Sequence, residues 1–313
     1  MADRLADIAA QISNVRQLEQ VVTAMRGIAA SRAQQARALL AGIEAYARVI
    51  SGAISEALSL TDDDAPAARS DDAGRCLIVF AAEQGFAGAF SERVFEAVTD
   101  DLAGAVVFVL GTRGVAAAAE RGVTPAFTAP MVTSAAAIPR LANKVADTLY
   151  HHIAEGRAAN VEVVYSHAPS GTGITVARRS LLPLDLTRFP RRQRSHPPLI
   201  TLPPEVLLER LAAEYVYAQL CEATMHAFVA ENDARVKAMA AAKSHIEAKL
   251  AGLSQRENQL RQEEITTEII ELAAGAEEIG KSTSKLQPRH GRTDGDGSSG
   301  AGKRPALRPP VMG

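Results

Sequence analysis

A stretch without proline, EVLLERLAAEYVYAQLCEATMHAFVAENDARVKAMAAAKSHIEAKLAGLSQRENQLRQEEITTEIIELAAGAEEI, runs from Glu205 to Ile279 and follows Pro203-Pro204. Its apolar residues recur at mixed spacings of three and four, which is the pattern of one helix face. At 1.5 Å per residue, about 75 residues make a rod of roughly 110 Å, several times the diameter of a small domain. Such a helix needs a partner helix within the chain or partners outside it, because most helix stability in water comes from packing an apolar face. The stripe comprises Leu211, Tyr215, Phe228, Met239, Ile246, Leu250, Leu253, Leu260, Ile269 and Ala273.

The other end of the chain carries a second stripe, from Asp3 to about Leu58, which no proline interrupts. Small residues dominate it from Ala29 to Ala36, which permits close approach of another helix. The two helices come from opposite ends of the chain, so we expect them to pair as an antiparallel coiled coil. The stripe comprises Leu5, Ile8, Ile12, Val15, Leu18, Val22, Met25, Ala29, Ala33, Ala36, Leu40, Ile43, Ala47, Ile50, Ile54 and Leu58.

Between the two helices the pattern changes to short apolar runs that alternate with helical stretches. This alternation predicts a right-handed, mostly parallel sheet with an antiparallel edge, a Rossmann-like α/β domain inserted between the helices. Expected strands are Cys76–Ala82, Ala105–Leu110, a piece near Ala126–Val132, and a hairpin of Val161–His167 with Gly173–Ser180; expected helices are Ser91–Leu102, a short one after the turn Gly111–Gly114 that ends at Glu120, and Ile138–Glu155.

These patterns divide the chain into six parts. The expected division is an N-terminal coiled-coil helix (1–60), a linker (61–75), the α/β domain (76–187), a basic, proline-containing linker (188–204), a C-terminal coiled-coil helix (205–280) and a disordered basic tail (281–313). The tail is rich in Gly, Ser and Pro, with many Lys and Arg and only two Asp, which is typical of disorder.

Composition excludes several classes of protein. The 34 Lys and Arg nearly cancel the 36 Asp and Glu, so the chain lacks the global positive field of a nucleic-acid binder. Cys76 and Cys221 are the only cysteines, which favours two free thiols in a reducing compartment. There is no run of 18 apolar residues and no signal-peptide core at the start, so we expect a cytoplasmic protein without a membrane span.

Three motifs could be taken for catalytic or binding sites. Residues 275–282, GAEEIGKS, match the phosphate-loop pattern, but a helix precedes them where that motif needs a strand, so we interpret the glycines as helix termination. The turn Gly85–Phe90 resembles only half of a dinucleotide fingerprint. His151 and His152 cannot share a helix face as metal ligands. We therefore predict no catalytic residues, no cofactor and no metal.

The residues carry a resemblance to a known family. Near the C-terminus, Asn258, Arg261-Gln262, Ile265-Thr266, Glu268, Glu271 and Gly275-Ala276 are similar to the motif N-x-x-R-Q-x-x-I-T-x-E-x-x-E-x-x-x-G-A of the gamma subunit, or central rotor shaft, of F-type ATP synthase. Arg235 and Met239 keep the same register, and Ile12 to Val15, Met25 and Ile28 to Arg32 resemble the family's first helix. Glu257, Gln84, Ala87 and Ala89 depart from the family pattern, which indicates a divergent member.

The resemblance implies a shaft that turns inside a ring of alpha and beta subunits, beside an epsilon subunit and on a membrane ring of c subunits. It would couple ion flow to ATP synthesis or hydrolysis at the cytoplasmic face of a bacterial plasma membrane, as a peripheral subunit without catalysis of its own. Implied contacts with the head are Met25, Arg32, Arg235, Arg261, Gln262, Thr266 and Glu268, and the implied contacts with the ring are Arg191, Arg192 and Arg194.

Two other classes of protein remain open. A coiled-coil scaffold with an α/β head would form a stable homodimer in isolation. An enzyme of the α/β domain would bind a nucleotide through the fragment Cys76–Ser180. The basic run Arg188–His196 is either a solvated connector or a contact with an acidic or membrane-adjacent partner.

Overall fold

Two long helices, α1 (Ala2–Leu58) and α5 (Pro204–Ser284), begin and end the described part of the chain. The computed structural model describes residues 2–61, 74–168, 173–191 and 198–284. Its contacts divide into two compact units, Ile8–Gln255 on the one hand and Met1–Asp7 with Arg256–Gly313 on the other. The predicted long helices are therefore confirmed, and most of each helix belongs to the first unit.

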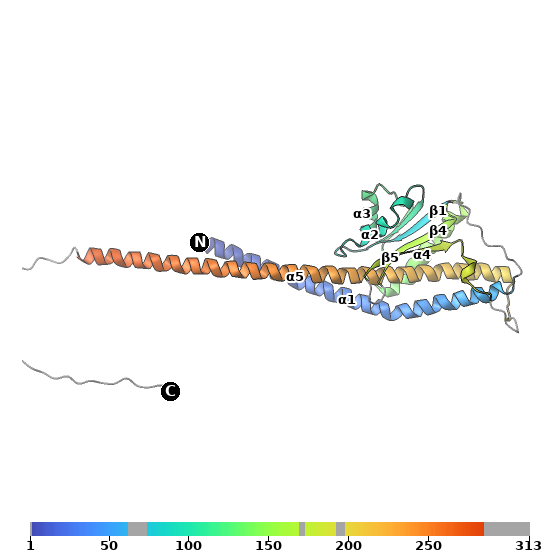
Figure 1. Cartoon of the computed structure of the whole chain (residues 1–313), viewed down its shortest axis with the longest axis horizontal. Coiled ribbons are helices and arrows are strands. Elements are labelled where there is room, and N and C mark those ends of the chain that lie inside the picture. The colour runs from blue at the N-terminus through green and yellow to red at the C-terminus, as the bar shows by residue number, and fades with distance from the viewer. Residues whose placement is uncertain (1, 62–73, 169–172, 192–197, 285–313) are drawn as a thin grey trace, which may run out of the picture. The chain divides into compact units, whose positions relative to one another are not determined.

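Within the first unit, α1 and α5 pack in opposite directions (Figure 1). Val22 of α1 shares a buried apolar cluster with Met239 and Ile246 of α5. Further along α1, Ile54 lies in a cluster with Tyr215. As residue numbers rise along α1 the numbers of the α5 partners fall, so the two helices run antiparallel.

The predicted stripe of α1 is the face that is buried. Ala29, Ala33 and Ala36 are at most 1% exposed, and their small side chains allow a close approach of the packed elements. One member of the stripe differs from the prediction, because Leu18 is 51% exposed. The three/four spacing drifts around a straight helix, since 3.6 residues make a turn, and position 18 falls to the rim of the buried face.

By length and composition, α1 passes the test for a helix that could cross a membrane, with a mean hydropathy of 1.3 over 18 residues. This value does not require the unbroken run of 18 apolar residues that the sequence lacks, because alanine, valine, leucine and isoleucine raise the window average between polar residues. In the structure the buried members of its stripe pack against other parts of the first unit, among them Ala36, Ile54 and Leu58. Of the apolar window itself, 17% is buried.

The middle of the chain forms a five-stranded sheet with the order β3-β2-β1-β4-β5. All neighbours are parallel except β4 and β5, which pair antiparallel, as the alternating pattern predicted. The strands are β1 (Arg75–Phe80), β2 (Val106–Leu110), β3 (Phe127–Ala129), β4 (Asn160–His167) and β5 (Thr175–Leu182), and the connecting helices are α2 (Phe90–Glu96), α3 (Thr112–Glu120) and α4 (Ile138–Ala154).

Two of the expected local boundaries were wrong. The helix expected over Ser91–Leu102 ends at Glu96, and a short 3-10 helix follows over Thr99–Asp101. A β-branched pair, Val98 and Thr99, and two aspartates disfavour continuation of the helix there. In addition, the residues expected as a turn after β2 largely belong to α3, which begins at Thr112 directly after Gly111.

The two faces of the sheet are covered by different helices. Residues Ile78 and Phe80 of β1 point into a core shared with α4 and α5, which includes Leu149 and Leu220. The alternate residue Val79 points into a separate core with α2 and α3. This period-two alternation follows from strand geometry. The first of these two cores packs the sheet directly against the long helix α5 (Figure 1).

The end of α5 also differs from the expectation. We expected Gly275 and Gly280 to terminate the helix, but α5 continues through both to Ser284. A glycine in a helix costs only about 1 kcal/mol relative to alanine, and the alanines and glutamates around these two glycines favour helix. Of the expected tail, residues 281–284 are thus helical, and residues 285–313 lie outside the described part, as does most of the linker 61–75.

Candidate functional surfaces

Four of the predicted head contacts lie together on α5. Arg261, Gln262, Thr266 and Glu268 are all exposed, within the stretch 256–276, which we call the exposed segment. Arg261 pairs with Glu257 one turn away at 3.2 Å, and the Thr266 hydroxyl donates to the Gln262 carbonyl at 2.8 Å. These contacts are local to the helix, so the polar side chains stay available to a partner.

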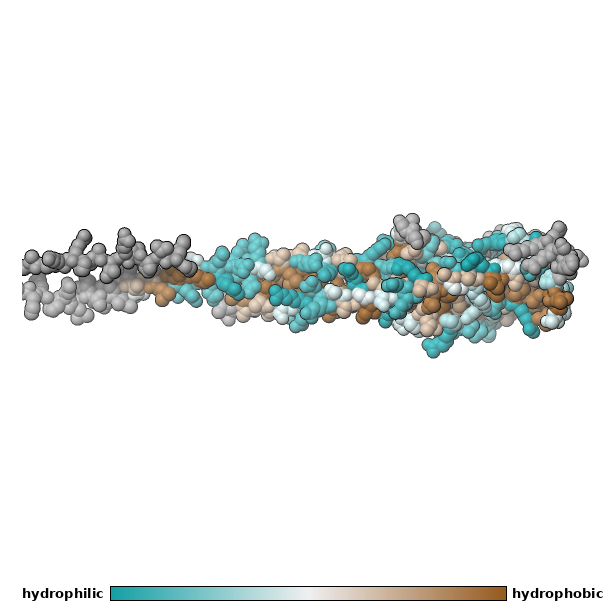
Figure 2. Space-filling view, turned by 90° about the horizontal axis from the view of Figure 1, so that it is seen from below, coloured by the Kyte–Doolittle hydropathy of each residue, from teal (hydrophilic) through white to brown (hydrophobic). Residues whose placement is uncertain are grey.

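The same exposed segment carries large apolar side chains in contact with solvent. Ile265 is 51% exposed, Ile269 60%, Ile270 62% and Leu272 74%. Apolar groups gathered in this way mark surfaces that another protein covers. In the space-filling view, brown apolar residues are likewise interspersed with teal polar ones on the helical surface (Figure 2). The segment therefore has the chemistry of a contact surface, with apolar and polar residues interleaved.

The two candidates on α1 lie in a different environment. Met25 is half-buried and packs on the cluster formed by Val22, Met239 and Ile246 between α1 and α5. Arg32 is also half-buried, and it forms no hydrogen bond or ion pair within the described ranges. The guanidinium of Arg32 can therefore donate hydrogen bonds to a partner, whereas Met25 mainly contributes to the packing of α1 on α5.

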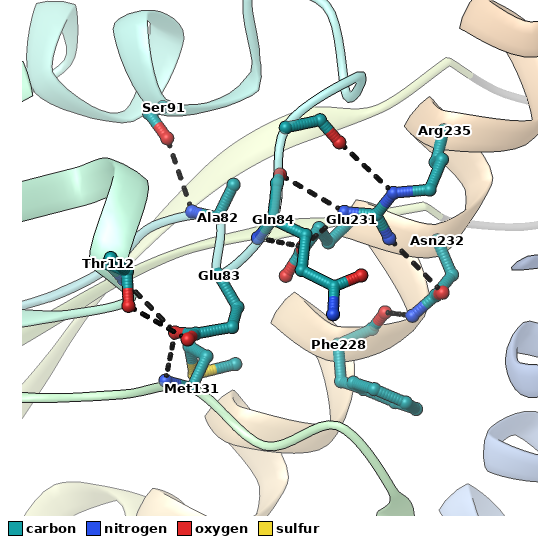
Figure 3. A network of polar contacts seen from close by, with 11 residues as sticks. Ala82, Glu83, Gln84, Ser91, Thr112, Met131, Phe228, Glu231, Asn232 and Arg235 are labelled. Atoms are coloured by element: carbon teal, nitrogen blue, oxygen red, sulfur yellow. Dashed lines mark hydrogen bonds and ion pairs between the residues drawn. The ribbon is translucent and has the colours of Figure 1, made fainter.

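Arg235 is buried, with only 5% of its surface exposed. Its guanidinium pairs with Glu231 one turn earlier on α5 at 2.6 Å. Nε donates to the Gly85 carbonyl at 3.2 Å and Nη2 to the Gln84 carbonyl at 3.1 Å. The donors of Arg235 are therefore used inside the chain, on the loop that follows β1 (Figure 3). This leaves almost no side-chain surface for contact with the head.

The loop after β1 is also fixed from its other side. The Glu83 carboxylate accepts hydrogen bonds from the Thr112 amide at 3.0 Å, the Thr112 hydroxyl at 2.8 Å and the Met131 amide at 2.8 Å (Figure 3). Gly111 makes this approach possible, because a Cβ there would lie 2.5 Å from the Ala81 carbonyl oxygen. The carboxyl edge of the parallel strands is the usual ligand site of such sheets. In this chain the Glu83 carboxylate lies at that edge and joins the start of α3 to the segment after β3.

Sequence reasoning missed three residues at this edge. Glu231 could have been found from its spacing of four before Arg235 on a helix, which favours an ion pair. Glu83 carried no such signal, because its partners, Thr112 at the start of α3 and Met131 after β3, are distant in the sequence. Phe86 is 66% exposed and has a positive φ of 62°, which is unusual for a bulky residue and points to a functional constraint on the loop.

A second set of polar contacts joins the sheet to α5. Arg179 of β5 reaches α5, with Nη1 at 3.0 Å from Glu222 and 2.5 Å from the Gln219 oxygen. Beside it, the rings of Tyr165 and His226 stack at 5.8 Å. Burial lowers the pKa of His226, and the Glu222 carboxylate opposes this shift. The imidazole is therefore held in its neutral form at the interface between the sheet and α5.

The predicted ring contacts are only partly described. Arg191 is exposed, and its Nη1 lies 3.5 Å from the Thr61 carbonyl oxygen at the end of α1. Arg192 and Arg194 lie outside the described residues. The structure thus brings one of the three arginines next to the end of the first helix.

The motifs that resembled catalytic sites do not have the required context. Residues 275–282 lie inside α5, so no strand precedes the phosphate-loop pattern. Cys76 and Cys221 are buried free thiols, and burial raises the pKa of Cys76 to about 12 and that of Cys221 to about 11. Neither thiol is ionised at neutral pH. Across the described ranges, no group of three or more His, Cys, Asp or Glu is arranged to hold a metal ion.

Comparisons with known proteins agree with this arrangement of helices and sheet. The model of the ATP synthase family ATP-synt matches residues 4–279. The ATP synthase gamma chain of Bdellovibrio bacteriovorus is 25% identical over 291 residues, which cover 88% of this chain and 98% of that protein. The gamma chain of Frankia casuarinae is 28% identical over 301 residues, 90% of this chain and 100% of that protein.

Solved structures show the same fold. A chain in the cryo-EM structure of the Euglena gracilis mitochondrial ATP synthase, in the assembly of OSCP, F1 and c-ring, has a TM-score of 0.65 at 12% identity and covers 94% of this chain. A chain of the rotor of the same synthase has a TM-score of 0.61 at 12% identity and covers 85%. The family model covers residues 4–279, so the chain belongs to the ATP synthase family, and the two relatives named above are gamma chains.

Proposed function

We propose that this chain is the rotating shaft that couples ion flow through the membrane sector to ATP synthesis or hydrolysis in a head of alpha and beta subunits. The observation that carries the proposal is the exposed segment of α5, where four large apolar side chains from Ile265 to Leu272 are more than half exposed. A segment with this surface needs partners from outside the chain. A ring of subunits that surrounds the helix would supply them.

The architecture suits a stiff shaft. We propose that α1 and α5 form an antiparallel coiled coil and that residues 76–187 are an inserted Rossmann-like domain, with linkers at 61–75 and 188–204. The successive clusters of Val22 with Met239 and of Ile54 with Tyr215 support the helix pairing. The sheet order β3-β2-β1-β4-β5, with helices on both faces, supports the proposed domain type.

Each proposed partner subunit is assigned to a group of side chains on this chain. We propose that Arg261, Gln262, Thr266 and Glu268 contact the alpha and beta subunits, because their side chains are exposed on one segment. Arg32 joins them as an arginine without a described internal partner. Arg191, Arg192 and Arg194 are proposed to face the ring of c subunits, with the epsilon subunit alongside. The chain would then be peripheral to the cytoplasmic face of a bacterial plasma membrane.

The mechanism requires an asymmetric surface and no nucleophile. An axle that presents a different face to each catalytic subunit binds their conformations with different free energies, and rotation shifts those populations in sequence. Since binding free energies are reciprocal, ATP hydrolysis in the head drives the axle, and torque from the membrane drives synthesis. We infer that the chain itself is not catalytic. Its buried thiols and the network around Glu83 support this inference.

One purification experiment tests the proposal against its alternatives. The full-length chain, tagged and expressed with the rest of its operon, should copurify as a single copy with alpha and beta. A coiled-coil scaffold would instead appear as a homodimer without those subunits. An α/β enzyme would bind a nucleotide with the chain alone, as measured by calorimetry with ATP. Either of the last two results would refute the rotor function.

A further inference from the structure

Two side chains on consecutive turns of α5 form hydrogen bonds with the main chain of the loop that follows β1. We call Glu231 and Arg235, together with the main chain of Gln84 and Gly85, the clamp. Glu231 Oε1 accepts from the Gln84 amide at 3.2 Å, and Arg235 donates to the carbonyls of Gln84 and Gly85 at 3.1 and 3.2 Å. The two side chains are only 4% and 6% exposed. The clamp thus joins parts of the chain about 150 residues apart in a dry environment.

The contacts of Glu83 continue the clamp into the sheet. This neighbouring residue binds Thr112 at the start of α3 and the Met131 amide after β3 (Figure 3). Asn232 completes the α5 side, because it donates to the Phe228 carbonyl at 2.8 Å and its oxygen lies 3.4 Å from Arg235 Nη1. A continuous series of polar contacts therefore runs from α5 through one loop to the carboxyl ends of β2 and β3.

Beside the clamp, apolar packing alone would fix the position of the loop along α5 only weakly. Around the clamp, the apolar contacts come from small or smooth groups, namely Ala82, Ala87, Phe90 and Ala230. Such contacts are non-directional and resist separation more than sliding. Hydrogen bonds and ion pairs depend on distance and angle, so they resist sliding and rotation as well.

A buried ion pair is also not the arrangement that stability alone would favour. Hydrophobic residues of similar volume often replace such pairs at no cost, and the best supported role of a buried pair is to specify register. The three hydrogen bonds from Glu231 and Arg235 to the loop specify one register of the α/β domain on α5, and the ion pair between the two side chains holds them in place. In a rotating shaft, that register transmits torque between the helix and the domain.

We propose that Arg235, with Glu231, is a positioning residue that locks the α/β domain to α5, so that torque passes between them without slippage. This inference rests on the proposed rotor function. It changes the role expected for Arg235 from an external contact with the head to an internal lock. The separate link between Arg179 and Glu222 lies about three turns nearer the start of α5 and also joins the sheet to that helix.

The test uses the complete synthase in membrane vesicles, with Arg235→Met and Glu231→Gln compared to the unmodified chain. Two quantities are measured in each sample, the rate of ATP hydrolysis and the ATP-driven membrane potential reported by a voltage-sensitive dye. We expect hydrolysis to persist while the potential per ATP hydrolysed falls severalfold in Arg235→Met and less in Glu231→Gln. In addition, hydrogen exchange of the Gln84 amide in Arg235→Met should accelerate by roughly a hundredfold, since one partner of a buried pair is lost.

Two controls separate the lock from general damage. Gln84→Ala leaves both main-chain contacts in place, and Arg178→Met removes an arginine that binds Asp101 and Glu162 within the α/β domain and not α5. Both should keep the normal ratio of potential to hydrolysis. The lock is refuted if Arg235→Met keeps that ratio, or if hydrolysis and potential fall in proportion. Failure of the rotor function itself would show differently, as an unmodified chain that is absent from the purified synthase.

Discussion

One helix, α5, passes through two contrasting environments. Between Tyr215 and Ile246, its side chains pack on α1 and on the sheet, and Val216, Leu220 and Met225 are at most 1% exposed. We call this the packed segment. Between residues 256 and 276 the same helix exposes Ile265, Ile269, Ile270 and Leu272. Both segments have a helical pattern of apolar residues, but among the described residues only the packed segment buries its large apolar side chains.

The contrast separates two uses of an apolar stripe. In the packed segment, burial contributes to the stability of the chain itself, as in any folded domain. In the exposed segment, more than half of the surface of each of these side chains is open to solvent and available for binding. Matched substitutions in the two segments should therefore affect different quantities. Folding stability should respond in the packed segment, and assembly should respond in the exposed one.

The largest effect on folding is expected from Leu220→Ala. Leu220 is 0% exposed in the core between α5 and the sheet, so its truncation should lower the free energy of unfolding by about 2–5 kcal/mol. Urea unfolding followed by circular dichroism measures this change. The matched variant Leu272→Ala removes a side chain that is 74% exposed and should stay within about 0.5 kcal/mol. Equal losses in both variants would remove the distinction between the segments.

A charge in the exposed segment should affect assembly instead. Ile269→Asp replaces a side chain that is 60% exposed, so the isolated chain should keep its stability within about 0.5 kcal/mol. Binding to the alpha and beta subunits should weaken by at least about tenfold, because burial of an isoleucine contributes roughly 1.5–3 kcal/mol. Pull-down with purified alpha and beta measures the loss. Leu199→Asp, outside the helix, is the control, and unchanged binding of Ile269→Asp would contradict the sheathed shaft.

A smaller effect, which depends on pH, is expected from His152→Leu in α4. His152 is 5% exposed, its ring meets that of Phe108 at 5.1 Å, and burial lowers its pKa. The unfolded chain then takes up the proton more readily, so folding stability falls as pH drops below the unfolded pKa of about 6.5. The variant should gain stability relative to the unmodified chain between pH 7 and pH 5. A stability difference between the two proteins that does not change with pH would contradict this linkage.

The smallest effect on folding is expected from Arg261→Ala. Its ion pair with Glu257 spans 3.2 Å, but the arginine side chain is 60% exposed. Exposed pairs at this helical spacing contribute only about 0.5 kcal/mol or less, and salt screens them. Thermal unfolding at low and high salt should show a small difference that disappears at high salt. A loss of several kcal/mol would indicate that the exposed segment has an internal partner after all.

Some features of this protein were available from local patterns in the sequence. The three/four spacing from Leu5 to Leu58 determined both the helix and its buried face, apart from Leu18. Short extended stretches between helical ones indicated the five strands of the described sheet, and their alternation with helices predicted a parallel sheet with one antiparallel edge. The motif around Arg261 and Thr266 identified the family. Each of these signals is contained within a few turns or strands, which is the range over which spacing and propensity act.

Other features depended on contacts between distant residues. The burial of Arg235, its hold on Gln84 and Gly85, and the role of Glu83 appear only when α5 meets a loop about 150 residues away in the chain. The sequence by itself determined the helices, the strands and the family, because these follow from local spacing and from a motif. Only the tertiary structure decided that Arg235 is buried and Arg261 is exposed, because burial is a property of what packs against a residue.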